Sequence, residues 1–107
     1  MIQVMAIFAL GINHKTAPVA LREQVAFAPE QLPEALRELT TQTSISDAVI
    51  LSTCNRTELY FNGSTSQAEQ VISWLAQFHA LNAAELQPHL YLHQDNAAAE
   101  HLMQVAA

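Results

Sequence analysis

The sequence predicts an α+β domain in which helices pack on one face of an antiparallel sheet, followed by the start of a further helix. Stretches with strand character alternate with stretches of helical periodicity along the chain. In the middle of the chain, the short segment 54–56 separates two strand-like stretches, and so short a connection makes them an antiparallel pair. The length of 107 residues is that of one ordinary domain.

The first half of the chain is predicted to hold one strand and two helices. The apolar stretch 5–13 has strand character and ends in a Gly-Ile-Asn break. Residues 18–27 follow as a short helix with proline in its first turn. A second helix covers residues 29–41, with leucines on one face at positions 32, 36 and 39. Pro33 leaves the start of this helix open by several residues, because an interior proline removes a backbone hydrogen bond.

The second half is predicted to hold a hairpin, a helix, a strand and a last helix. The hairpin strands are residues 47–53 and 57–62. Ser66 and Glu69 have the spacing of a capping box, and they open a helix with a stripe of large apolar side chains (Val71, Trp74, Leu75, Phe78, Leu81). Residues 89–93 are the fourth strand. Asp95 is a candidate cap for the last helix, in which Ala98, Leu102 and Val105 share a face.

This order of elements, strand, helices, strand, strand, helix, strand, matches the split βαβ arrangement of the ferredoxin-like fold. Helices on one face of the sheet leave the other face for a ligand or another domain. The pattern from His101 to Ala107 is mid-helical and has no terminal signal. We therefore expect residues 1–107 to be a domain truncated at its C-terminal end.

Charge and composition limit the class of function. The net charge is −6, and the chain has four cationic side chains, Lys15, Arg22, Arg37 and Arg56. A broad basic surface for nucleic acid is therefore excluded, and a polyanionic partner must be met locally or held by something outside this chain. The apolar start lacks the basic region of a signal peptide and is too short to span a bilayer. A single cysteine gives no disulfide framework, so we expect a cytoplasmic protein without membrane contact.

Cys54 is the candidate nucleophile. It lies in the hairpin connection, two residues before Arg56. The thiolate is the nucleophilic form of cysteine, and a nearby cation favours that form. Two alternatives stay open: a lone cysteine often serves as a small buried hydrophobe, and Arg56 could be a surface residue at a turn.

The five histidines, His14, His79, His89, His93 and His101, are equivalent candidates for proton transfer on the residue pattern alone. With one cysteine and no close histidine and aspartate cluster, a structural zinc site is not expected. His14, Lys15 and Thr16 follow the first strand, where they either line the same end of the sheet as Cys54 or form a polar loop. Glu58 is expected to face solvent or to pair locally.

Four segments, in this order, closely resemble the amino-terminal domain of glutamyl-tRNA reductases. They are residues 11–18 (GINHKTAP), 21–23 (LRE), 51–60 (LSTCNRTELY) and the start of a further signature at 101–106 (HLMQVA). The resemblance covers essentially the whole chain. A Ser-Thr-Cys-Asn-Arg-Thr-Glu segment is far harder to meet by chance than a short glycine motif.

The resemblance implies an enzyme that uses NADPH to reduce glutamyl-tRNA to glutamate-1-semialdehyde, the precursor of 5-aminolevulinate and tetrapyrroles. It places the nucleophile on Cys54, the histidine important for activity on His101, and substrate contacts on Thr53, Asn55 and Arg56. It also implies a nucleotide-binding domain and a helical domain that makes a homodimer, both outside residues 1–107. The chain has only two glycines and no glycine-rich phosphate loop, so NADPH is expected to bind elsewhere in the full-length protein.

Two other classes of function remain open. One is a ferredoxin-like RNA-binding module in which Cys54 is incidental. The predicted strands lack the basic and aromatic pattern that such modules use for stacking on bases, and the net charge has the wrong sign. The other is a regulatory module of the same topology, for which the sequence contains no positive signal.

Overall fold

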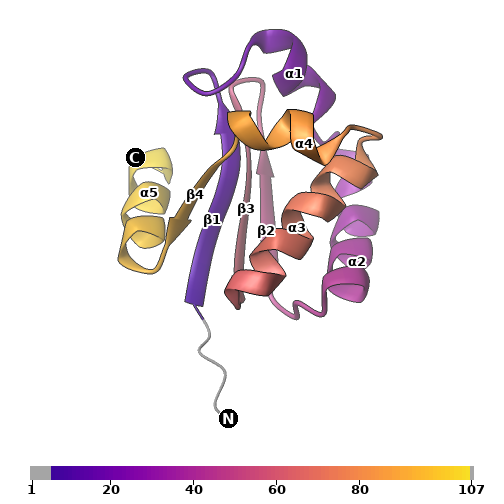
Figure 1. The fold of residues 1–107 in the computed structure, drawn as a ribbon. Coiled ribbons are helices and arrows are strands. Elements are labelled where there is room, and N and C mark those ends of the chain that lie inside the picture. The colour runs from indigo at the N-terminus through magenta and orange to yellow at the C-terminus, as the bar shows by residue number, and fades with distance from the viewer. Residues whose placement is uncertain (1–5, 107) are drawn as a thin grey trace.

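Four antiparallel strands form the centre of the fold in the computed structural model, which describes residues 6–106 (Figure 1). They are β1 (Ala6–Asn13), β2 (Ala48–Ser52), β3 (Arg56–Gly63) and β4 (Tyr91–Gln94). Their order in the sheet is β2-β3-β1-β4. Strand β3 therefore lies between β1 and β2, which are connected along the chain by the first two helices. The α+β class and the antiparallel β2–β3 pair are confirmed.

The helical segments are α1 (Val19–Gln24), α2 (Leu32–Thr43), α3 (Thr65–Phe78), α4 (Ala83–Leu86) and α5 (Asn96–Ala106), with 3₁₀ turns η1 (Pro29–Gln31) and η2 (Gln87–His89). The predicted helix over residues 29–41 is divided between η1 and α2. Pro33 lies in the first turn of α2, where its missing N–H costs nothing. The short helix α4 was not predicted, because four residues carry too little periodicity to identify.

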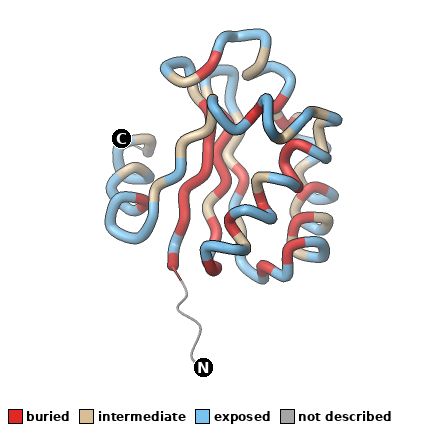
Figure 2. Tube along the Cα trace, viewed as in Figure 1, coloured by how far each residue is buried: buried red, intermediate tan, exposed pale blue. Residues whose placement is uncertain are grey.

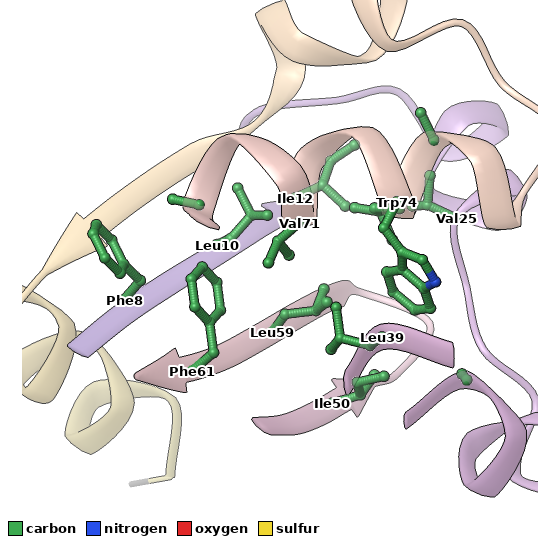
Figure 3. Packing of buried hydrophobic residues seen from close by; sticks show 14 of the residues in the cluster. Phe8, Leu10, Ile12, Val25, Leu39, Ile50, Leu59, Phe61, Val71 and Trp74 are labelled. Carbon is green, nitrogen blue, oxygen red and sulfur yellow. The ribbon is translucent and has the colours of Figure 1, made fainter. Parts of the chain in front are cut away.

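One face of the sheet carries the hydrophobic core. Alternate residues of β1, namely Phe8, Leu10 and Ile12, are buried there with Leu59 and Phe61 of β3. Figure 3 shows these side chains between the strands and the helix that contributes Val71 and Trp74. Leu39 of α2 joins the same cluster. The two long helices α2 and α3 therefore cover one face of the sheet (Figure 1).

Helix α5 packs against the opposite face, over β1 and β4 (Figure 1). Ala9 of β1 and Ala98 of α5 are buried, although neither belongs to the main core cluster. Figure 2 shows that most of β1 is buried, whereas much of α5 is exposed. The expected face of α5 is partly wrong, because Leu102 is exposed while Ala98 and His101 point inward. This end of the second face is thus covered by the chain's own further helix.

Several element boundaries differ from the expectation for local reasons. The first strand begins at Ala6, and its predicted first residue, Met5, lies outside the described residues. His89 belongs to η2 and not to the fourth strand. The predicted capping pair Ser66 and Glu69 is wrong: helix α3 begins two residues earlier, where Ser64 and Gln67 form the capping box. Asp95 does lie immediately before α5, and its carbonyl accepts from the Ala99 N–H at 3.0 Å. Its side-chain Oδ1, however, accepts from the backbone N–H of Ile7 at 3.2 Å.

Candidate active site

The turn between β2 and β3 presents Cys54 to solvent. Cys54 is a free, exposed thiol, and Thr53 and Asn55 on either side of it are exposed as well. The backbone N–H of Thr53 donates to the Arg56 carbonyl at 2.8 Å and closes the turn. The N–H of Asn55 donates to Thr53 Oγ1 at 3.3 Å. The turn is therefore held by its own hydrogen bonds while the sulfur stays free.

Ser52 ties the base of this turn to a distant segment of the chain. Its Oγ accepts from the backbone N–H of Phe27 at 2.9 Å and lies 3.0 Å from Thr57 Oγ1. Phe27 is buried in the core. These contacts join the two strands to each other and to the segment of Phe27, so the base of the cysteine turn is tied to the hydrophobic core.

The loop after β1 lies at the same end of the sheet, because Asn13 is paired with Arg56. Asn13 Oδ1 accepts from the backbone N–H groups of Lys15 and Thr16, at 2.9 and 3.2 Å. The Asn13 N–H donates to Thr16 Oγ1 at 3.0 Å. This tight polar turn leaves the side chains of His14 and Lys15 exposed.

A cavity of about 160 Å³ opens between this loop, the start of β3 and α5. Its lining residues are Asn13, His14, Lys15, Arg56, His101, Gln104 and Val105. Two of the chain's four Lys and Arg side chains, Lys15 and Arg56, meet here. In an otherwise acidic chain, this cavity suits an anionic ligand group.

Glu58 lies beneath this cavity and connects two of its lining residues. Its side chain is 0% exposed, on the sheet face that α5 covers. Tyr60 Oη donates to Glu58 Oε1 at 2.9 Å, and Tyr91 Oη donates to Oε2. His101 Nε2 also bonds Oε2, and Arg56 Nη1 lies 3.9 Å from the same oxygen.

The network keeps Glu58 ionised. Burial raises the pKa of its carboxyl, but the hydrogen bonds from Tyr91, His101 and Tyr60 and the charge of His101 outweigh that effect. The pKa of Glu58 therefore lies below its ordinary value of 4.5. Burial, followed by the hydrogen bonds to Glu58, raises the pKa of both Tyr60 and Tyr91. Both hydroxyls thus remain donors, and Glu58 acts purely as an acceptor.

The structure brings Arg56 and His101 together at one cavity, and His14 and Lys15 join them. Cys54 does not line that cavity. It lies two residues from Arg56, so the two Cα atoms are at most about 7 Å apart. Thr53 and Asn55 flank the sulfur on the same turn and are not cavity-lining residues either.

Sequence reasoning missed Glu58. Glu58 alternates along the strand with Arg56 and Tyr60, so these three side chains share one side of it. On a half-buried strand, the side with polar residues is predicted to face solvent. A solvent-facing Glu58 is wrong, because α5 covers this side of β3 and Glu58 is fully buried. The alternative expectation of local pairing is confirmed by Tyr60 and Arg56, each two residues away. Tyr91 of β4, the other tyrosine that donates to Glu58, was missed for the same reason.

The family model of the glutamyl-tRNA(Glu) reductase N-terminal domain matches residues 10–107. The chain belongs to the glutamyl-tRNA reductase family. The match covers the strand, turn and helix segments that supply Cys54, Arg56, Glu58 and His101. The family resemblance of the sequence motifs is thereby confirmed.

Relatives in this family match nearly all of the chain. The glutamyl-tRNA reductase of Marinobacter nauticus is 54% identical over 96% of the chain, and that of Nitrosococcus oceani is 52% identical over the same share. In both cases the match spans 24% of the relative, so the chain covers about a quarter of the length of these glutamyl-tRNA reductases. The structure of the Methanopyrus kandleri glutamyl-tRNA reductase superposes with a TM-score of 0.71 and 26% identity, over 94% of this chain and 22% of the other.

Two further observations concern residues 6–106. No group of three histidine, cysteine or acidic side chains in this part of the chain could hold a metal ion. None of the helices described there is both long enough and apolar enough to cross a membrane.

Proposed function

We propose that this domain captures the glutamyl group of glutamyl-tRNA as a thioester on Cys54, the first step of an NADPH-dependent reduction to glutamate-1-semialdehyde. One observation carries the proposal: the exposed thiol lies on a turn that leads directly into Arg56, and Arg56 shares a cationic cavity with His101. Family membership supports the substrate, because the matched relatives are named for it.

The chemistry of an aminoacyl ester suits a thiol nucleophile. The Cys54 thiolate attacks the ester carbonyl, a carbon–sulfur bond forms, and the bond to the ribose oxygen at the tRNA 3′ end breaks. The departing oxygen takes up a proton, and we assign its donation to His101, one of the two histidines that line the cavity. The resulting thioester accepts hydride more readily than a carboxylate, so one difficult reduction becomes two easier steps.

The neighbouring side chains supply binding groups. The side chain of Arg56 is 24% exposed, and its contact with Glu58 is made by Nη1, which leaves other guanidinium donors for a substrate carboxylate. Thr53 and Asn55 present a hydroxyl and an amide beside the sulfur. We assign Thr53, Asn55 and Arg56 to substrate binding, and Cys54 and His101 to catalysis.

The residues of this chain do not fit NADPH. The chain's two glycines, Gly11 and Gly63, lie within strands β1 and β3, and no glycine-rich loop is available to hold a pyrophosphate. We therefore assign the cofactor, and the homodimer contacts of a cytoplasmic enzyme, to parts of the full-length protein outside residues 1–107. The strand order also supports our assignment of the domain to the ferredoxin-like split βαβ arrangement.

The test uses a full-length reductase whose amino-terminal part is this chain. Glutamyl-tRNA is added without NADPH, the reaction is quenched in acid, and the intact mass is measured. We expect one glutamyl group per Cys54, removed by mild base, and none in a Cys54→Ser variant. NADPH-dependent reduction should fall in that variant to background.

The alternative functions make the opposite prediction. An RNA-binding or regulatory module with an incidental cysteine would bind tRNA equally well with serine at position 54 and would form no adduct. A Cys54→Ser enzyme that still reduces glutamyl-tRNA at the original rate would refute the thioester. Helix α5 already lies over β1 and β4 on the sheet face that base-stacking modules leave open.

A further inference from the structure

Glu58 is a buried charge that the main core does not explain. A carboxylate without water is costly unless donors surround it. Here the donors are Tyr60, Tyr91, His101 and, at 3.9 Å, Arg56. Two of these four groups belong to the proposed substrate site. The Glu58 carboxylate therefore contacts both His101 and Arg56, the two residues of the proposed substrate site that line the cavity.

The contact decides which nitrogen of His101 carries the proton. Glu58 is ionised and accepts only, so the bonded Nε2 must be the N–H in both the neutral and the charged imidazole. Within residues 6–106, the hydrogen bonding of the His101 ring is made by Nε2 alone. Nδ1 is thus the nitrogen left to exchange a proton with the substrate.

We infer that Glu58 is a positioning residue whose carboxylate fixes the Nε2–H tautomer of His101, stabilises the protonated His101 ring with its charge, and lies against Arg56 through the same oxygen. This inference rests on the proposed function, in which His101 protonates the leaving oxygen. Nδ1 of the neutral ring takes up the proton that the Cys54 thiol loses as the carbon–sulfur bond forms, and the resulting imidazolium passes that proton from Nδ1 to the ribose oxygen as its bond to carbon breaks. Protons therefore balance over the step, and no further reactant is needed.

Tyr91 and Gly11 complete the arrangement. Tyr91 donates to the same Glu58 oxygen as His101, and its ring lies 5.1 Å from the His101 ring between centroids. The His93 ring lies 4.6 Å from His101 on the same side of the sheet. A side chain on Gly11 would collide with Tyr91 Oη and Glu58 Cγ. The orientation of the imidazole is thus set by its ring neighbours as well as by the carboxylate.

The informative variant is Glu58→Gln. A glutamine amide is isosteric, and its oxygen at the Oε2 position can accept from both Tyr91 and His101. Its NH₂ group then faces the Tyr60 hydroxyl, which can accept. The variant keeps the packing but loses the charge that stabilises a protonated His101. Thermal unfolding measures whether the fold is retained.

The experiment is single-turnover acylation of Cys54 in the full-length reductase, followed by acid quench and mass measurement over a range of glutamyl-tRNA concentrations. We expect Glu58→Gln to lower the maximal acylation rate about 10- to 100-fold. The half-saturating concentration should not rise, because Arg56 keeps its charge. Glu100→Gln is the matched control, since it removes an exposed carboxylate next to His101 in the same helix, and it should acylate at the original rate.

A double-mutant cycle separates positioning from a structural role. If Glu58 acts through His101, Glu58→Gln causes no further loss in a His101→Asn background. An equal loss in both backgrounds, or no loss in either, overturns the inference. Failure of the proposed function looks different: the parent enzyme then forms no adduct at Cys54, or Cys54→Ser retains full activity. Alkylation of Cys54 by iodoacetamide at an unchanged rate in Glu58→Gln shows that the turn itself is intact.

Discussion

Gly11 of β1 lies directly opposite Glu58 of β3, and the Glu58 side chain fills the space that a side chain at position 11 would need. A carbon added at Gly11 would lie 2.8 Å from Glu58 Cγ, 2.7 Å from Tyr91 Oη and 2.9 Å from the Thr57 carbonyl oxygen. One of these neighbours is backbone in the centre of the sheet, so it cannot move aside cheaply. The missing side chain makes room for the buried carboxylate.

Gly11→Ala should therefore destabilise the domain by about 1–3 kcal/mol, as overpacking does in other cores. Gly63→Ala is the matched control, because a carbon added there comes closer than 3.0 Å only to Gln67 Oε1, the end of a flexible side chain. Urea denaturation of both variants measures the difference. Equal costs at the two positions would contradict the close packing at Gly11.

The free energy of unfolding should depend on pH through the ionisation of Glu58. The pKa of Glu58 is lower in the folded state than its ordinary value of 4.5, so the native state binds fewer protons than the unfolded chain. Its stabilising contribution is fully present above pH 4.5, declines as the pH falls below that value, and is lost once the pH passes the folded pKa. Glu58→Gln should flatten this decline. Denaturant unfolding at a series of acidic pH values tests it, and parallel curves for the two proteins would argue against an ionised Glu58.

His79 should make the free energy of unfolding depend on pH as well, in a range above that of Glu58. It lies among aromatic rings, with its ring centroid 4.6 Å from that of Phe27, and its Nε2 is buried without a hydrogen-bond partner in the described residues. Burial lowers its pKa from 6.5. Stability should therefore decline as the pH falls from 6.5 through the folded pKa. His79→Phe keeps an aromatic ring, and it should remove this part of the slope while leaving the behaviour at pH 8 similar.

Cys54 should react with alkylating reagents in the folded protein, because its side chain is exposed. Iodoacetamide at neutral pH should modify it completely without denaturant, as followed by intact mass. The cysteine is single, so one adduct is expected. Modification that appears only after unfolding would show that the thiol is a buried structural group.

Helix α3 should depend on Ser64. Its Oγ accepts from the Gln67 N–H at 3.3 Å, and Gln67 Oε1 accepts from the Ser64 N–H at 2.8 Å. Ser64→Ala should cost about 1 kcal/mol in unfolding free energy, as for other helix caps. Ser66→Ala is the control, because Ser66 lies inside the helix and bonds only the Ser64 hydroxyl among the described groups. A larger loss of unfolding free energy in Ser66→Ala than in Ser64→Ala would instead support Ser66 as the helix cap, as the sequence pattern predicted.

Local patterns of the sequence were enough for the antiparallel β2–β3 pair, the amphipathic helices and the turn that carries Cys54. Alternation places Leu59 and Phe61 in the core, and the three residues between the strands leave the thiol at a tip. The same patterns misplaced the α3 cap and the inward face of α5. A cap depends on where the chain leaves the preceding strand, and β3 ends one residue before Ser64.

The sequence by itself determined which side chains have the chemistry, namely a thiol beside an arginine and a histidine in a family motif. Only the tertiary structure decided that Glu58 is buried and that His101 meets it through Nε2. Residues 58 and 101 are far apart in the chain, and neither carries a local signal of the other. They meet because α5 folds back over the second face of the sheet, a contact set by packing and not by periodicity.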